Sequence, residues 1–338
     1  MNTSINIKHA TDIIVKSIKA WEKLGRQTHP IVLEGSPGLG KSAIWEQIAN
    51  RLGYQFEVSQ PALDEPADYK GIPYIVEGFA DFFAPARLRL MCEATQPILW
   101  LFDDLGHTPR GVQAALMHLV HAREIGGRKI SDNVFFAFAT NSKKDKAGVN
   151  PIISPLADRL TKLEVHADIK SWSTWAMEAG FKPEDIAFLR FKPECLDNLK
   201  PNTDFIKGGT PRSWTNVFQY TKAGIVDELL IAGDVGMANA SEYMAFQALL
   251  RELPNIDAMF LNPEGAQIPT KPSILFALSG AIVSRAEVAN LDVVLKLVNR
   301  IPKDFQVWVM KDIATRIPEA QSTTSFLNWF MDNQDVVL

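Results

Sequence analysis

The sequence is poor in cysteine, has no long apolar run and carries only a small net charge. Its two cysteines, Cys92 and Cys195, lie far apart in 338 residues and form no C-x-x-C pattern. This usage argues against a disulfide framework and fits two buried or idle thiols in a reducing cytoplasm. A formal net charge of −4 does not point to nucleic acid as the main partner, although a local basic face could still bind it.

Neither membrane insertion nor secretion is predicted. No stretch approaches 18 uninterrupted apolar residues, and the segment from Met1 to Lys8 is polar with no apolar signal core. We therefore expect a cytoplasmic protein without a membrane partner. The apolar fraction of 46% is ample for packed cores, and the length suggests two domains.

One segment matches a complete phosphate-binding pattern, G-x-x-x-x-G-K-[ST]. The apolar run 31–33 before it predicts a short buried strand, and apolar residues at helical spacing between 44 and 52 predict a helix after it. Strand, glycine-rich loop and helix are the context that this motif requires, which a chance Gly/Pro-rich turn would not have. The candidate nucleotide-binding residues are Gly35, Ser36, Pro37, Gly38, Leu39, Gly40, Lys41 and Ser42.

The residue types in this loop suit a nucleoside triphosphate with Mg²⁺. Glycines allow positive φ and a close approach of backbone N–H groups to phosphate oxygens at a helix N-terminus. Lys41 would reach the β- and γ-phosphates, and the hydroxyl of Ser42 would bind Mg²⁺. The motif alone does not fix the base of the nucleotide.

A second candidate site follows the apolar run 98–102, which ends in Asp103 and Asp104. This pattern is typical of a Walker B strand, in which Asp103 would hold Mg²⁺ and Asp104 would orient or deprotonate the attacking water. Ligands gather at the carboxyl ends of parallel strands, so this site should face the phosphate loop. Adjacent acids after a strand can also form a turn or a helix cap, which is the alternative. His107, three residues after Asp104, could lie near the same site or simply begin a helix.

Strands alternate with helices up to about His166, and the chain then reads as helical. This pattern predicts a mainly parallel sheet covered on both faces, in a domain at 1–166, followed by a helical domain at 167–338. Residues 59–86 are rich in Pro, Asp and Gly and should leave the sheet. We expect strands at 31–33, 55–58, 98–102 and 134–139, and helices at 11–24, 86–93 and 109–123.

The order of motifs resembles that of AAA+ ATPases, most closely the MoxR-like and dynein-related branch. After the phosphate loop and Asp103-Asp104 come a strand with Asn141, the run Pro-Leu-Ala-Asp-Arg-Leu at 155–160, and Gly-Thr-Pro-Arg-Ser-Trp at 209–214. The resemblance covers residues 30–220, and no motif of similar specificity follows residue 235. It implies a P-loop NTPase sheet sandwiched by helices, then an all-helical lid with a C-terminal helical region, and it implies ATP as the nucleotide.

Three further site residues are carried over by this resemblance. Asn141 aligns with sensor 1, which helps to position the attacking water and the γ-phosphate. Arg159 aligns with the arginine finger, which acts in a neighbouring subunit's site, and Arg212 aligns with sensor 2, which reaches from the lid to the phosphates. The alternatives are an asparagine in a turn and two surface arginines. With Lys41 and Asp104, these residues make up the predicted catalytic set.

One position departs from the family pattern, because Asp104 stands where the Walker B motif has Glu. Its carboxylate is one methylene shorter, so hydrolysis could be slow or could proceed through a second water. A non-catalytic switch, in which ATP binding only orders the lid, is therefore an open alternative.

The resemblance also implies partners. Family members form homo-oligomers, typically hexameric rings, act on protein clients and often work with a partner containing a von Willebrand factor A domain. The aromatic residues of the 59–86 insert are our candidate client-contacting surface, unless they pack onto the sheet. A DNA-associated ATPase, such as a loader or a restriction-type motor, is the second hypothesis. The aromatic residues concerned are Tyr69, Tyr74, Phe79, Phe82 and Phe83.

Overall fold

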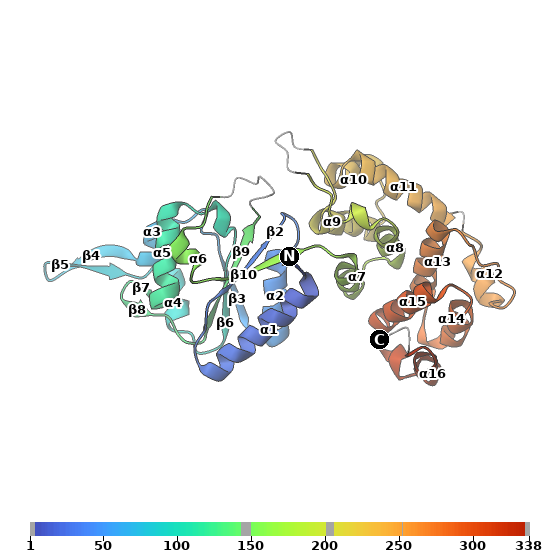
Figure 1. The fold of residues 1–338 in the computed structure, drawn as a ribbon, viewed down its shortest axis with the longest axis horizontal. Coiled ribbons are helices and arrows are strands. Elements are labelled where there is room, and N and C mark those ends of the chain that lie inside the picture. Colours follow the sequence, from blue (N-terminus) through green and yellow to red (C-terminus); the bar gives the residue numbers. More distant parts are fainter. Residues whose placement is uncertain (1–3, 143–149, 201–205, 252, 335–338) are drawn as a thin grey trace. The chain divides into compact units, whose positions relative to one another are not determined.

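The computed structural model describes residues 4–142, 150–200, 206–251 and 253–334 (Figure 1). Its internal contacts divide the chain into two compact units, Met1–His166 and Ala167–Leu338.

The first unit is built on a six-stranded sheet in the order β1-β10-β2-β9-β6-β3, with every neighbouring pair parallel. The strand that carries Asn141, β9, therefore lies between β2, which enters the phosphate loop, and β6, which ends before Asp103. The strands of the sheet are β1 (Ile5–Asn6), β2 (Ile31–Gly35), β3 (Gln55–Ser59), β6 (Ile98–Phe102), β9 (Val134–Asn141) and β10 (Thr161–His166).

Helices cover both faces of this sheet, as Figure 1 shows. On one face, Trp21 of α1 and Trp45 of α2 contact Phe135 of β9, with ring centroids 5.4 and 6.5 Å apart. On the other face, α4 and α5 pack on Trp100 and on Phe138 of β9. Burial on both faces explains the nearly unbroken apolar sequences of β6 and β9. The helices and turns of this unit are α1 (Ile7–Leu24), α2 (Lys41–Leu52), α3 (Pro66–Lys70), α4 (Ala86–Cys92), η1 (Leu105–His107), α5 (Arg110–Ala122) and α6 (Ser154–Ala157).

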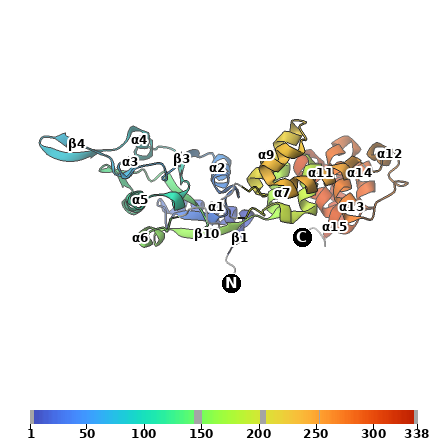
Figure 2. The same cartoon turned by 90° about the horizontal axis from the view of Figure 1, so that it is seen from above.

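The segment 59–86 leaves the sheet, as its composition predicted. It holds α3 and a separate antiparallel hairpin of β4 (Ile72–Val76) and β5 (Phe79–Phe83), which extends away from the sheet in both views (Figures 1 and 2). Phe79 is 78% exposed, and Phe82 and Phe83 are about half exposed. The expectation for Tyr69 was wrong, because its ring is buried against Phe102 beneath α3 and cannot contact a client.

The second unit is helical throughout its described residues. Its α8 packs along α13, and the contact is so close that a Cβ on Gly280 would come within 2.9 Å of Glu184 Cα. Trp172 of α7 is buried in the core of this unit. The helices are α7 (Ile169–Glu178), α8 (Pro183–Phe191), α9 (Pro211–Lys222), α10 (Glu228–Val235), α11 (Met237–Arg251), α12 (Ile256–Leu261), α13 (Pro272–Arg285), α14 (Leu291–Val298), α15 (Lys303–Arg316) and α16 (Thr324–Asp332), with 3-10 turns η3 (Pro193–Cys195), η4 (Val288–Asn290) and η5 (Pro318–Ser322).

A buried carboxylate joins three of these helices. Asp185 of α8 accepts hydrogen bonds from Thr221 Oγ1 (2.5 Å), Tyr243 Oη (2.6 Å) and Gln247 Nε2 (2.8 Å). Burial raises the pKa of the Asp185 carboxyl, and the three donors partly offset that rise. These bonds fix the spacing of α8, α9 and α11 in the unit that carries Arg212.

Two parts of the fold differ from the sequence expectation. Helix α1 begins at Ile7 and not near residue 11, because Asn6 caps it by accepting a hydrogen bond from His9 N at 2.9 Å. Strand β10 was not anticipated, and it pairs with β2 from Thr161 onward.

Among the described residues, no single helix is long and apolar enough to span a membrane. One bent pair of segments, Pro272–Arg285 and Val288–Val298, reaches that length and hydropathy when the two are taken together.

We predict that Trp100→Ala destabilises the first unit by about 3–5 kcal/mol, the usual cost of truncating a fully buried aromatic side chain. Trp100 is inaccessible to solvent, and its Nε1 donates to Ser59 Oγ at 2.9 Å. Denaturant unfolding followed by circular dichroism measures the loss. Phe79→Ala, at the exposed hairpin, is the matched control and should change stability little. Equal effects of the two substitutions would contradict this placement.

Candidate nucleotide-binding site

The phosphate loop joins β2 to α2 in the conformation that its glycines allow. Gly38 and Gly40 have φ values of 82° and 86°, which disfavour any other residue. A Cβ on Gly40 would meet no atom within 4 Å, so the space beside the loop is open. No side-chain hydrogen bond caps α2 in the described structure, so its first N–H groups are directed toward this space. The loop therefore fits a bound phosphate chain.

Lys41 connects the loop to the neighbouring strand. Its ammonium is almost fully buried and donates to Gly35 O, Ser36 O and Asn141 Oδ1, each at 2.9 Å. A buried ammonium must have such partners, because leaving it unpaired costs far more than these bonds contribute. The ammonium lies beside the loop, so a phosphate bound there would replace one of these three oxygens as its hydrogen-bond acceptor.

Ser42 and Asp103 form the second part of the site. Ser42 Oγ donates to Asp103 Oδ2 at 2.6 Å, which brings the start of α2 and the end of β6 together. Asp103 is itself held, because its N–H donates to Ser59 O and its Oδ1 accepts from Asp104 N, both at 2.9 Å. A hydroxyl and a carboxylate are the oxygen ligands that Mg²⁺ prefers, so these two residues fit the predicted metal.

Asp104 has an unusual backbone. Its φ of 53° and ψ of 39° place a residue other than glycine in the left-handed region, which costs energy and is often found at functional positions. Asn141 Nδ2 donates to Asp104 Oδ1 at 3.3 Å, and His107 Nδ1 lies 3.8 Å from the same oxygen. The Asp104 side chain is 53% exposed, so water can reach it.

Strand register explains why these residues meet. Gly35 of β2 is paired with Asn141 of β9, and Phe102 of β6 is paired with Phe138 of β9. All three strands run in the same direction, so the residues that follow them gather at the carboxyl end of the sheet. Ser59, at the end of β3, also lies there and was missed, although its position after a short predicted strand was a usable signal.

Arg159 is not part of this cluster, and Arg212 belongs to the second unit. Arg159 comes just before β10, whose Thr161 is paired with Ile31 at the start of β2, so it lies at the amino end of the sheet. Its Nη1 donates to Pro155 O at 2.6 Å. The five residues of β2 separate the two ends of the sheet by about 17 Å at 3.3 Å per residue, beyond the reach of one arginine side chain. Arg212 is exposed at the start of α9, in the second unit.

No protein-family model matches this chain. A curated relative, the Holliday junction branch migration complex subunit RuvB of Treponema denticola, is 45% identical over 74 residues, which are 22% of each protein. The match therefore spans about a fifth of that relative's length.

Solved structures with a similar course of the chain include two of RuvB from Thermotoga maritima. A point mutant of that protein has 15% identity and a TM-score of 0.45, covering 82% of this chain and 83% of that one. The Holliday junction branch migration motor has 14% identity and a TM-score of 0.39, covering 82% and 80%.

The strand order, the phosphate loop between β2 and α2 and the helical second unit confirm the predicted fold class, a parallel sheet covered by helices and followed by a helical region.

Proposed function

We propose that this protein is an Mg-ATP-hydrolysing AAA+ ATPase that works as a homo-oligomer, in the form of a hexameric ring. The observation that carries the proposal is the continuous set of contacts from Ser42 and Asp103 to Lys41, Asn141 and Asp104 at one end of the sheet. In this proposal, the loop amides and Lys41 bind the triphosphate. Ser42 and Asp103 would hold Mg²⁺, which would supply positive charge against the charge that develops on the phosphates.

Asp104 and Asn141 would act on the attacking water. Asp104 is exposed, lies beside the metal ligand Asp103 and shares a hydrogen bond with Asn141. Its shorter side chain leaves room for a second water between the carboxylate and the nucleophile. The side-chain amide of Asn141 also accepts a hydrogen bond from Lys41. The same amide would therefore contact the γ-phosphate and orient the Asp104 carboxylate.

The position of Arg159 supports the proposed oligomer. A cation that lies at the amino end of the sheet cannot serve the phosphate loop at the carboxyl end of the same subunit. It can serve the loop of a neighbour, where an arginine stabilises transition-state charge by about 10³ to 10⁵ in rate. Arg212, in the proposed helical lid, would couple nucleotide state to the geometry of the subunit.

A protein client fits the exposed hairpin better than nucleic acid does. The hairpin shows Ile75, Phe79 and Phe82 to solvent, and its residues 72–83 include Glu77 and Asp81 but no lysine or arginine. Exposed apolar side chains suit contact with a protein surface, and the neighbouring carboxylates repel phosphate. This supports a remodelling or chaperone-like motor of the MoxR-like type, with a von Willebrand factor A domain protein as a candidate partner.

A DNA-associated motor is the second candidate. It is favoured by the 74-residue similarity to RuvB of Treponema denticola, whose name refers to branch migration at Holliday junctions. In that case a basic surface away from the hairpin would contact the phosphate backbone. The non-catalytic switch is the remaining alternative, and only turnover separates it from an ATPase.

We predict that ATP turnover per subunit rises with protein concentration and that Arg159→Ala lowers the plateau by at least about 10³-fold, since the finger acts between subunits. Steady-state phosphate release across a dilution series checks this. The exposed Arg110→Ala, elsewhere on the first unit, is the control. Turnover that is independent of both concentration and Arg159 in a protein shown to be monomeric would contradict the shared site.

Asp104→Ala should lower turnover by about 10²- to 10⁴-fold, the usual contribution of a general base, while ATP binding is retained. Asp104→Glu restores the longer side chain and should retain or raise turnover. Nucleotide binding is measured in parallel with a fluorescent ATP analogue. Turnover of Asp104→Ala equal to that of the wild type would remove Asp104 from the mechanism. Tight ATP binding by the wild type without turnover would establish the switch.

The nature of the client is tested by comparing DNA and protein binding in the same variants. Phe79→Ser with Phe82→Ser should abolish capture of a permanently unfolded model protein and leave basal turnover unchanged, because both side chains are remote from the site. The control is Lys129→Ser, on an exposed strand. Salt-sensitive binding to branched DNA that the hairpin substitutions do not affect would instead favour the DNA-associated motor.

A further inference from the structure

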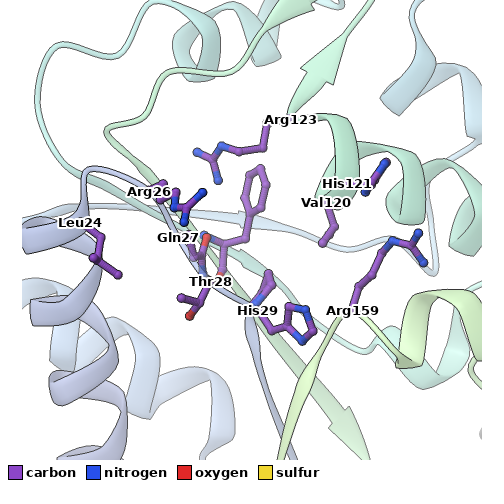
Figure 3. Close-up of a pocket in the computed structure, with 11 residues that line it drawn as sticks. Leu24, Arg26, Gln27, Thr28, His29, Val120, His121, Arg123 and Arg159 are labelled. Carbon is purple, nitrogen blue, oxygen red and sulfur yellow. Dashed lines mark hydrogen bonds between the residues drawn. The ribbon is translucent and has the colours of Figure 1, made fainter.

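A cavity of about 360 Å³ opens at the amino end of the sheet, away from the phosphate loop. Side chains from the segment after α1, from the end of α5 and from the segment before β10 surround it (Figure 3). In this view His29 lies between Arg26 and Arg159. The lining residues with ionisable side chains are Arg26, His29, His121, Arg123 and Arg159.

The cavity is strongly basic. Among the described residues that line it, none is an aspartate or a glutamate. Arg123 has a structural role, because it donates to Ser131 O (3.0 Å) and Val134 O (2.7 Å) and stacks 4.5 Å from the Phe136 ring centre. Burial lowers the pKa of the Arg123 guanidinium, which reflects the cost of keeping its charge in this wall.

Two of the lining residues, Arg26 and His29, lie on a loop that is held in place. Gly25 ends α1 in the left-handed conformation with a φ of 64°. Gln27 then acts like a strand residue: its Nε2 donates to Phe136 O and its Oε1 accepts from Phe136 N, both at 2.7 Å. This pair of bonds fixes the residues on either side, so Arg26 and His29 are presented at defined positions and are exposed.

Three guanidinium groups line one cavity in which no described lining residue carries a carboxylate, so an anion would be stabilised there. Arginine binds phosphate through two parallel hydrogen bonds, so the chemistry points to a polyphosphate ligand. The nucleotide of the same subunit lies too far away, because the length of β2 separates this cavity from the phosphate loop. The carboxyl end of the sheet carries Asp103, Asp104 and the proposed triphosphate, so it is complementary in charge to the amino end of another copy.

We propose that this basic cavity receives the polyphosphate chain of a nucleotide bound by a second copy of the protein, with Arg26 as a second intersubunit cation beside Arg159. The inference rests on the proposed nucleotide binding at the phosphate loop, but not on hydrolysis. Gln27 is the positioning residue that holds Arg26 in this role. Because the contact joins the amino end of one sheet to the carboxyl end of the next, the assembly it stabilises is head-to-tail.

The test measures assembly in the presence of Mg²⁺ and a non-hydrolysable ATP analogue by sedimentation velocity. Arg26→Ala should raise the protein concentration at half-assembly by about tenfold or more, the range expected for one lost charge-assisted hydrogen bond. Lys23→Ala, three residues earlier and outside the cavity, should assemble like the wild type. Arg26→Lys keeps the charge but not the two parallel bonds, so it should fall between Arg26→Ala and wild type.

Binding of a fluorescent ATP analogue to dilute subunits separates this contact from the subunit's own site. Arg26→Ala should bind it with wild-type affinity below the assembly concentration. Assembly of Arg26→Ala at the wild-type concentration, or weakened nucleotide binding by its dilute subunits, would overturn the inference. So would a wild-type protein that binds nucleotide without assembling. Absent turnover in a protein whose assembly depends on Arg26 would instead refute only the proposed hydrolysis.

A free anion is the other source of the same chemistry. Inorganic tripolyphosphate is therefore titrated into dilute Lys41→Ala subunits, whose phosphate loop is disabled, and binding is followed by calorimetry. Weak or absent binding there, with Arg26-dependent assembly on nucleotide, supports the contact between copies. Tight binding that Arg26→Ala abolishes without any effect on assembly would overturn it in favour of a soluble polyphosphate effector.

Discussion

The candidate site depends on one interaction, the hydrogen bonds of the buried Lys41 ammonium. They join the carbonyls of the phosphate loop to the amide of Asn141, which in turn contacts Asp104. Three strands thereby share one network, and a phosphate that displaced any of these oxygens would change the others. The cost of an unpaired buried ammonium makes this coupling obligatory. Under the proposed function, a bound nucleotide would therefore change all of these contacts together.

The parallel sheet has a second effect, because it places the candidate nucleotide site and the basic residues at opposite ends. The side chains that we propose bind phosphate and metal follow the strands, while the basic residues around Arg159 precede them. The five residues of β2 set the distance between the two groups. At the amino end, before β2 begins, the side-chain amide of Gln27 pairs with the backbone N–H and C=O of Phe136 in β9. Both ends are therefore fixed to the same rigid element.

Local patterns predicted most of this arrangement. The phosphate loop, the buried strand before Asp103 and the strand before Asn141 were found because each is a short apolar run followed by polar residues. Strand β10 was missed because lysine and glutamate interrupt its apolar residues. The basic cavity could not be predicted, since its residues come from three distant segments and only strand pairing brings them together. Tyr69 was misjudged because a single aromatic residue carries no sign of which side of an insert will be buried.

The placement of Arg159 and the phosphate loop at opposite ends of one sheet has a consequence for stoichiometry. When Arg159 of one subunit reaches the phosphate loop of the next, two subunits complete one site and leave one phosphate loop without an arginine. An open chain of subunits therefore always has one incomplete site, and only a closed ring has none. A two-fold symmetric dimer joins the same surface of both subunits, so it would not bring Arg159 of one subunit to the phosphate loop of the other. The direction of the strands thus gives any such assembly a polarity, and every hairpin of β4 and β5 would then project from equivalent positions around it.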